Sequence, residues 1–417
     1  MKTIFKAAAF LAICIIMSGS ASAVPTVTIN SVAQRWPWNN KVDINYTVTD
    51  GQDKASSRFY KIVFTTVAKG VTYTVDSANL RSSADTGTHT ATWTLPSGIR
   101  SLDCRMSATI CKSDVPNGDD YMVVDLTKAG FESVSFEGMT TQAAANTRYN
   151  TAEYKTNKLV LRKVPAGGPY QYLWNVGDTR RTDRDYYIGI FPVTQKQYEL
   201  VGADSGSTPS YCTAEKENNV IAHRPVERVS WDDLRLSTTA ATSSIPVVAE
   251  ANTGTFFQRL VYKTGRRFSF DLPTDMMFEI AARAGVTTYY FWGNSTMDDS
   301  KLVCKQNSDS STVAVGSHDP NNWGLYDVQG NVWEMGLDSF ATNWGNESTV
   351  GFSVRTNVFA PYYNPESNLH TWLGGKSWAD EAKGDESYWR LHVMAGDIGN
   401  SDKRAETIGF RVSVVMD

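Results

Sequence analysis

Oxygen-bearing residues are spaced for cation binding in the segment DVQGNVWE, residues 327–334. Asp327 and Glu334 supply carboxylate oxygens, Gly330 permits a tight turn, and the carbonyls of Gly330 and Val332 can add ligands. Oxygen-rich ligation on a loop suits calcium better than zinc. The segment therefore predicts a structural calcium ion bound by these four residues. The alternative is a cap beside a buried Trp333, with no ion.

The cysteines limit the metal chemistry that this chain can perform. After residue 23 the chain has Cys104, Cys111, Cys212 and Cys304, and no cysteine follows. No Cys-x-x-Cys or His-Glu-x-x-His pattern occurs, so the sequence gives no support to a zinc site. In an oxidising compartment Cys104 can pair with Cys111, and Cys212 with Cys304. The alternative is four buried thiols, because spacing alone does not give Cα separations.

The N-terminus has the composition of an export signal. Lys2 and Lys6 supply positive charge, residues 7–17 are apolar, and residues 21–23 read Ala-Ser-Ala, a small-residue cleavage site. The apolar run is too short to span a bilayer, and no later run is long enough. After cleavage of residues 1–23 we expect an exported protein that does not span the membrane, whether periplasmic, at the cell surface or secreted.

The composition places few limits on the function. Hydrophobic residues make up 41% of the chain and charged residues 20%, which is ordinary for a soluble globular protein. The formal net charge is −4 and no basic stripe is evident along the sequence. Nucleic acid is therefore not an expected partner.

Two domains separated by a linker are predicted. Within residues 24–126 the run KVDINYTV alternates, so that Val42, Ile44 and Tyr46 share one face of a strand. Several short strands separated by turns favour an all-β sandwich, and its size makes it immunoglobulin-like by analogy. Residues 127–157 are rich in Ala, Thr, Ser and Asn and are predicted to be a linker. The second domain then covers residues 158–417.

Short, capped elements begin the second domain. Thr194 and Ser230 are placed to cap helices, and a helix that starts at Thr274 has apolar residues at i, i+3, i+4 and i+7. From residue 289 onward Gly, Asn, Asp, Ser and Trp dominate, which predicts turns rather than long elements. The chain is thus predicted to be α+β, with an all-β sandwich before a domain of little regular secondary structure.

Eight segments of the second domain follow the order typical of one family. They are residues 159–167, 187–198, 224–234, 270–285, 291–294, 315–334, 373–378 and 408–412. The most specific part is GLYDVQGNVWE, residues 324–334. On these motifs the domain resembles the sulfatase-modifying factor family, also called the formylglycine-generating enzyme family. The resemblance implies a fold similar to that of a C-type lectin.

The resemblance also implies that the calcium site is retained and that the family's oxidase reaction is absent. Family members bind calcium at the positions that match the four predicted ligands, and a second family site would involve Asn307 and Ser308. The family's oxidases bind copper through two cysteines after a GGSW-type motif and convert a sulfatase cysteine to formylglycine. Here GGKSW at residues 374–378 contains an extra lysine, and Ala379 and Asp380 stand where the first cysteine would be. Copper(I) needs soft thiolate ligands, so neither copper nor the oxidase reaction is expected.

Aromatic and Arg residues occupy the region of the missing cysteines, namely Trp378, Tyr388, Trp389 and Arg390. They suit stacking against a sugar or a peptide, and the alternative is that they fill the groove as core. We therefore expect an exported, non-catalytic ligand-binding or accessory protein, without catalytic residues, whose partner is a protein or a glycan. The competing hypothesis is a divergent metal-dependent oxidase related to formylglycine-generating enzyme.

Overall fold

The computed structural model divides the chain into two compact units, Met1–Tyr121 with Val134–Thr140, and Met122–Ser133 with Thr141–Asp417. The residues that it describes are 25–35, 40–49, 60–76, 84, 86–95, 98–100, 105–112, 118–171, 179–202, 209–214, 220–235, 254–293, 298–339, 358–359, 370–373, 376–382 and 404–416. The predicted export signal, residues 1–23, lies outside these ranges.

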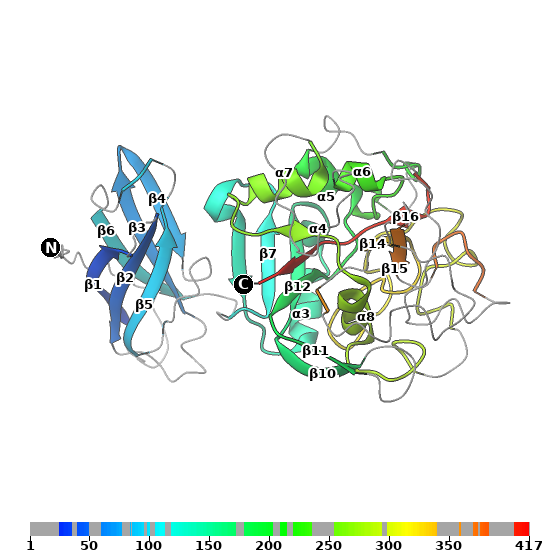
Figure 1. Ribbon diagram of the computed structural model, residues 1–417, viewed down its shortest axis with the longest axis horizontal. Helices are drawn as coiled ribbons and strands as arrows, with labels where there is room; N and C mark the ends of the chain where they lie inside the picture. Colours follow the sequence, from blue (N-terminus) through cyan, green and yellow to red (C-terminus); the bar gives the residue numbers. More distant parts are fainter. Residues whose placement is uncertain are drawn as a thin grey trace, which may run out of the picture. The chain divides into compact units, whose positions relative to one another are not determined.

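The first unit contains two antiparallel three-stranded sheets (Figure 1). Their orders are β1-β2-β5 and β4-β3-β6, with bounds β1 Thr26–Gln34, β2 Lys41–Thr49, β3 Tyr60–Ala68, β4 Val71–Asp76, β5 Gly87–Thr94 and β6 Arg105–Lys112. The predicted alternation is confirmed, because Val42, Ile44 and Tyr46 are buried in the core between the sheets. Trp93 of β5 and Phe64 of β3 are buried in the same core.

A six-stranded sheet, ordered β13-β17-β12-β9-β7-β8, organises the second unit, although its edge strand β8 lies in the Val134–Thr140 segment assigned to the first. Its strands are β7 Tyr121–Asp125, β8 Val134–Glu137, β9 Lys158–Val164, β12 Tyr186–Gly189, β13 Phe270–Asp271 and β17 Ser413–Val415. Two smaller sheets pair β10 Gly167–Gln171 with β11 Thr179–Thr182, and place β14 Trp333–Ser339 between β15 His370–Leu373 and β16 Ile408–Gly409. The second domain therefore begins earlier than residue 158, since β7 already belongs to this sheet.

The predicted linker is wrong, because residues 127–157 are folded. They form η2 Gly130–Ser133, strand β8 and the helices α3 Gln142–Tyr149 and α4 Ala152–Thr156. Thr141 caps α3 by accepting the Ala144 N–H, and the alanines that looked like linker are good helix formers. Tyr149 and Tyr154 are buried and meet edge to face, which anchors both helices.

The predicted helix caps are confirmed. Thr194 caps α5 Gln195–Val201, Ser230 caps α6 Trp231–Leu234, and Thr274 caps α8 Asp275–Arg283. The remaining helical elements are η4 Ile221–His223 and α7 Phe256–Lys263. Within the described ranges, none of the helices is long and apolar enough to cross a bilayer.

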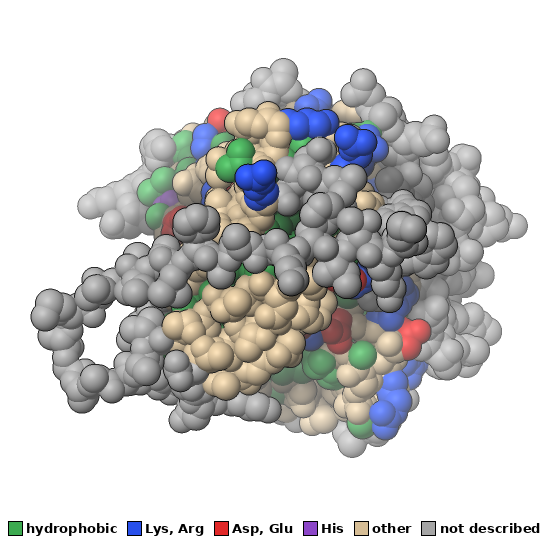
Figure 2. Space-filling model, turned by 90° about the vertical axis from the view of Figure 1, so that its left-hand side faces the viewer, with side chains coloured by type: hydrophobic (Ala, Val, Ile, Leu, Met, Phe, Trp, Pro, Cys, Tyr) green, Lys and Arg blue, Asp and Glu red, His purple; other side chains and the backbone are tan. Residues whose placement is uncertain are grey.

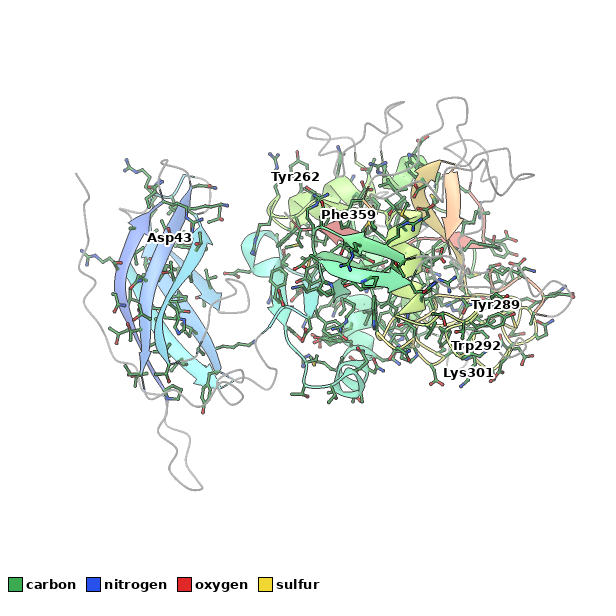
Figure 3. All side chains as sticks on the ribbon, turned by 60° about the horizontal axis from the view of Figure 1, so that its bottom comes forward. Asp43, Tyr262, Tyr289, Trp292, Lys301 and Phe359 are labelled. Carbon is green, nitrogen blue, oxygen red and sulfur yellow. The ribbon has the colours of Figure 1, made fainter. Side chains whose placement is uncertain are left out.

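Helix α8 is the centre of the second unit, and all of its residues are buried. It packs against Tyr186, whose hydroxyl donates to the Met277 carbonyl at 2.9 Å, and Phe359 meets the Tyr186 ring edge to face. Between α8 and β14 the described residues contain only turns, bends and isolated bridges, as predicted. Figure 3 shows that side chains nevertheless fill this region, with Tyr289 and Trp292 labelled within it.

Candidate functional site

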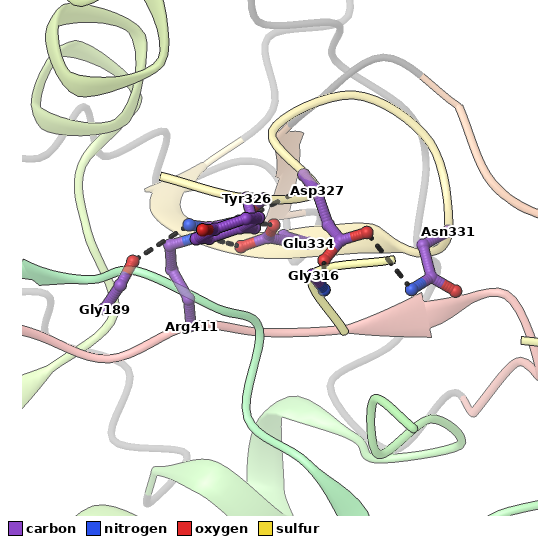
Figure 4. Close-up of polar contacts among 7 residues, drawn as sticks. All are labelled: Gly189, Gly316, Tyr326, Asp327, Asn331, Glu334 and Arg411. Carbon is purple, nitrogen blue, oxygen red and sulfur yellow. Dashed lines mark hydrogen bonds and ion pairs between the residues drawn. The ribbon is translucent and has the colours of Figure 1, made fainter. Parts of the chain in front are cut away.

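Glu334 and Arg411 form a buried ion pair at the start of β14. The Arg411 Nε donates to Glu334 Oε2 at 2.7 Å and its Nη2 donates to Oε1 at 2.6 Å, so one guanidinium holds both carboxylate oxygens (Figure 4). Arg411 also donates to the carbonyls of Gly189 at 2.9 Å and Tyr326 at 3.1 Å. This single side chain therefore ties the end of β12 and the loop before β14 to β14 itself.

Asp327 lies beside this pair in a different environment. Its carboxylate accepts the Gly316 N–H at 2.8 Å and the Asn331 amide at 3.4 Å (Figure 4). Burial raises the pKa of the Asp327 carboxyl, against the lowering effect of the Gly316 N–H and of more distant positive charges. Asp327, Glu334 and Arg411 together carry a formal charge of −1 when all are ionised. An added cation would therefore meet an excess of negative charge at this site.

The predicted calcium ligands fit the ion in part. Asp327 is half-buried, and its carboxylate makes no ion pair with any described residue. Glu334 has both oxygens on Arg411, so it can reach a cation only by sharing them, and the Gly330 carbonyl already accepts the Val332 N–H at 2.9 Å. No group of three or more acidic, His or Cys side chains among the described residues is arranged around one metal position. A calcium ion at this loop thus depends on Asp327.

The loop itself requires a glycine at position 330. Gly330 has φ +84°, and a Cβ there would lie 2.4 Å from the Val303 carbonyl oxygen. Asn331, in the left-handed region at φ +64°, donates its backbone N–H to that same carbonyl. The motif therefore fixes how the segment before β14 packs on residue 303, whether or not an ion is bound.

Asn307 and Ser308, the residues of the second family site, are engaged by protein groups. Asn307 Oδ1 accepts the Cys304 N–H at 2.9 Å, and its Nδ2 donates to the Leu302 carbonyl at 2.8 Å. The Ser308 hydroxyl donates to the Trp378 carbonyl at 2.9 Å. These contacts hold the 302–308 loop together and attach it to the segment that contains Trp378.

Trp378 is a packing residue in this structure. Only 7% of it is exposed, its indole N–H donates to the Glu406 carbonyl at 3.0 Å, and its backbone N–H donates to the Asn331 carbonyl at 2.9 Å. The ring lies in a cluster with Cys212 and Val303. This favours the alternative that Trp378 fills the groove as core, because little of the ring is left for a ligand.

Asp380 takes the position expected for the first copper-binding cysteine. Its Oδ2 accepts both the Ser377 N–H at 2.8 Å and the Ser377 hydroxyl at 2.7 Å, so the carboxylate closes a turn of its own segment. The other predicted ligand-binding residues, Tyr388, Trp389 and Arg390, lie outside the described residues.

A buried carboxylate holds the loop that reaches Trp378 from the other side. Glu227 is fully buried and accepts the N–H groups of Tyr211 at 2.9 Å and Cys212 at 2.8 Å. Burial raises the pKa of the Glu227 carboxyl above its ordinary value of 4.5, although both N–H groups act to lower it. The folded protein therefore binds this proton more tightly than the unfolded chain does.

Titration of Glu227 should contribute to the pH dependence of the protein's stability. Because its folded pKa is raised, its contribution is complete below about pH 4.5 and is lost as the pH rises through the folded pKa. Glu227→Gln removes this titration, so the difference in unfolding free energy between wild type and variant should move in favour of the variant as the pH rises. Urea unfolding at several pH values from 4 to 8 measures that difference. A difference that does not change with pH would contradict this prediction.

The described cysteines are thiols. Cys111, Cys212 and Cys304 are free, and the last two are buried, so the disulfide between Cys212 and Cys304 considered from the sequence is not formed. Cys104 lies outside the described residues. Burial raises the pKa of the Cys304 thiol, which makes it a poor nucleophile and a poor metal ligand at neutral pH.

The role of Arg411 was not predicted from the sequence. It lies in the segment of residues 408–412, which contributed only to the family resemblance. A signal was present, since Arg411 stands between the apolar residues Phe410 and Val412, and all three are buried. A charged residue in an apolar strand-like run requires a buried partner of opposite charge, and the carboxylates of the 327–334 motif were the available candidates.

Comparison with known proteins finds relatives named as formylglycine-generating enzymes or as an inactive form of one. The chain is 33% identical over 154 residues to a formylglycine-generating enzyme of Thermomonospora curvata, which covers 34% of this chain and 48% of that protein. It is 29% identical over 158 residues to the Inactive C-alpha-formylglycine-generating enzyme 2 of Mus musculus, covering 35% and 42%. The chain thus matches less than half the length of these curated relatives.

Solved structures also align with this chain. Treponema denticola variable protein 1 aligns with a TM-score of 0.43 at 20% identity, over 62% of this chain and 95% of that one. PvdO from Pseudomonas aeruginosa aligns with a TM-score of 0.42 at 18% identity, over 62% and 94%.

The family description "Sulfatase-modifying factor enzyme 1-like domain" matches residues 152–415, more than half of the chain. The match contains the 327–334 loop, Trp378 and Arg411, which together form the site described above. This chain therefore belongs to the sulfatase-modifying factor, or formylglycine-generating enzyme, family.

Proposed function

We propose that this protein is an exported, non-catalytic member of its family that acts as a ligand-binding or accessory protein. The observation that carries the proposal is the absence of cysteine from residues 305–417, where the family's oxidases would bind copper. Asp380, at the first of those positions, is a hard carboxylate that already closes a turn with Ser377. Such a group does not replace a thiolate for copper(I). Export is supported by the N-terminal residues 1–23.

A precedent within the family supports a role without the oxidase reaction. The mouse relative is named an inactive formylglycine-generating enzyme. The domain can thus persist where the reaction is absent, and the Glu334–Arg411 pair and the Gly330 turn of this chain stabilise the fold without taking part in chemistry.

The competing hypothesis, a divergent metal-dependent oxidase, is tested by direct assay. The purified protein should leave a peptide containing Cys-x-Pro-x-Arg unchanged after incubation with copper(I) and oxygen, as judged by mass spectrometry. Metal analysis should find neither copper nor iron at one equivalent. Formation of formylglycine, or a stoichiometric redox metal, would replace the proposed function with the oxidase.

We assign ligand binding to the segment that includes Tyr388, Trp389 and Arg390, since Trp378 is committed to packing. Two aromatic rings and a guanidinium suit stacking against a sugar or a peptide. On glycan and peptide arrays, wild type should bind and Trp389→Ala should bind at least about fivefold more weakly, as expected for the loss of one stacking ring. The proposed location is wrong if wild type binds no spot or if the variant binds equally well.

We propose that calcium binds at the 327–334 loop through Asp327, with Gly330, Val332 and a shared oxygen of Glu334. One millimolar calcium should raise the melting temperature by about 5–10 °C over EDTA if its Kd is near 10 μM. Asp327→Asn should abolish this rise, and Asp319→Asn, which alters an exposed carboxylate, should retain it. If wild type melts at the same temperature in calcium and in EDTA, the loop binds no calcium.

The first unit supports an accessory role. We propose that it is an immunoglobulin-like module, because its sheets β1-β2-β5 and β4-β3-β6 follow the order expected when strands alternate between two packed Greek-key sheets. Such a module would serve as a spacer or an adhesion domain that presents the second unit.

A further inference from the structure

Helix α7 presents a cluster of cations that the 327–334 loop and the Trp378 segment do not involve. Between Glu250 and Asp271 the chain has four basic residues and no acidic one. Arg259 and Lys263 are four residues apart on α7 and so lie on one face of the helix. Arg266 follows the end of the helix, in the left-handed region at φ +58°, and its guanidinium lies over the ring of Tyr262 on α7. The sequence showed no basic stripe because these charges come together only through the helix and the turn that ends it.

The inward face of α7 fixes the orientation of this cluster. Phe256 and Leu260 are fully buried, and Phe256 stacks on Tyr198 of α5 with ring centroids 5.5 Å apart and an interplanar angle of 10°. It also meets Phe410 edge to face at 4.9 Å. The opposite face of α7 is therefore held outward on a rigid support.

An exposed aromatic ring lies at the centre of the cluster. Tyr262 is 39% exposed, and the Arg266 guanidinium lies over its ring at 4.4 Å from the centroid. Figure 3 labels Tyr262 at the rim of the unit to which Figure 1 assigns α7. Figure 2 shows Lys and Arg side chains among hydrophobic ones on the face that it draws. The surface thus combines an apolar ring with adjacent positive charges.

Two carboxylates on elements that pack against α7 are paired with other cations. Asp271 is bound by Arg235 at 2.8 Å, and Glu199 of α5 is bound by Lys196 at 2.9 Å. In the parts of the chain that the structure describes, Arg259, Lys263 and Arg266 make no ion pair. Cations at a helix C-terminus interact favourably with the helix dipole, which accounts for Lys263 but not for the exposed ring beneath Arg266.

We infer that this α7 surface, formed by Arg259, Tyr262, Lys263 and Arg266, binds an acidic polysaccharide. A sugar ring can stack on Tyr262 through its apolar face while its sulfate or carboxylate groups meet the flanking cations. Duplex DNA is a poorer match, because its affinity comes from many phosphate contacts along an extended basic track, whereas this surface has a few cations around one ring on a chain of net charge −4.

Affinity electrophoresis in gels containing dextran sulfate, polygalacturonate, neutral dextran, poly-glutamate or duplex DNA tests the inference on the full chain. Wild type should be retarded by the two acidic polysaccharides at low salt and not by neutral dextran. The double variant K263E/R266E should bind at least about tenfold more weakly, as expected for reversing two charges that meet the ligand. Tyr262→Ala should bind the acidic polysaccharides about fivefold more weakly.

The matched control is K61E/R105E, which makes the same change in net charge on β3 and β6 of the first unit and should bind like wild type. The inference is overturned if wild type is not retarded, or if the control loses as much affinity as K263E/R266E. It is also overturned if poly-glutamate or duplex DNA binds as tightly as the acidic polysaccharides with no effect of Tyr262→Ala. This test does not depend on the Trp389 segment, so either result leaves the proposed function to its own experiments.

Discussion

Replacing Arg411 with methionine is expected to destabilise the second unit by about 3–5 kcal/mol. The substitution leaves the Glu334 carboxylate buried without a partner and removes the donor to the carbonyls of Gly189 and Tyr326. Burial already raises the pKa of Glu334 and Arg411 opposes this effect, so without Arg411 the carboxyl must take up a proton or expose itself to water. For a unit of this size the melting temperature should fall by about 10 °C in calorimetry.

Two further variants show whether the buried charge is the cause. Adding Glu334→Leu to Arg411→Met removes the stranded carboxylate and should recover part of the lost stability, although the two carbonyls remain without their donor. Arg404→Ala breaks the Arg404–Asp233 pair, in which the arginine is 41% exposed, and should cost less than about 1 kcal/mol. The explanation is wrong if Arg411→Met melts like wild type or if the double variant is the less stable of the two.

Local signals in the sequence predicted the elements whose causes are themselves local. Thr194, Ser230 and Thr274 cap helices because a side-chain oxygen three residues before a backbone N–H is sufficient to start one. The alternation of β2 required only that one face of a strand be buried. The 327–334 motif identified the family for the same reason, since its Gly330 turn depends on a close backbone approach that few sequences satisfy.

The features that the sequence did not show concern residues whose environment is set by distant segments. Residues 127–157 looked like a linker because their composition is polar and weakly periodic, yet Tyr149 and Tyr154 anchor two helices there. Arg411 and Glu334 are separated by 77 positions, and no local pattern shows that they meet. Trp378 was assigned to a ligand cleft from its position after the GGKS motif, but its surroundings come from Cys212, Val303 and Glu406.

The variant Trp378→Ala distinguishes a packing role of Trp378 from a ligand-binding role, and we expect it to lower stability strongly. If Trp378 is a packing residue, Trp378→Ala should lower the unfolding free energy by about 3–5 kcal/mol. The variant loses the buried ring and leaves a cavity beside Cys212 and Val303. It also loses the indole donor to the Glu406 carbonyl. Urea unfolding followed by circular dichroism measures this loss directly. A ligand platform would behave in the opposite way, with stability near that of wild type and binding on the arrays abolished.

The conservative variant Trp378→Phe makes the test quantitative. Phenylalanine keeps most of the buried apolar area but has no N–H group, so it should cost about 1–3 kcal/mol, the range for leaving a buried carbonyl without its donor. Tyr262→Ala, at a 39% exposed ring, should change stability by less than about 1 kcal/mol and serves as the aromatic control. If Trp378 is a packing residue that joins the 302–308 loop to the segment before β14, stability should decrease from Tyr262→Ala to Trp378→Phe and be lowest for Trp378→Ala. If all three variants are equally stable, Trp378 does not act as a packing residue, and the open ligand cleft that the sequence first indicated is supported instead.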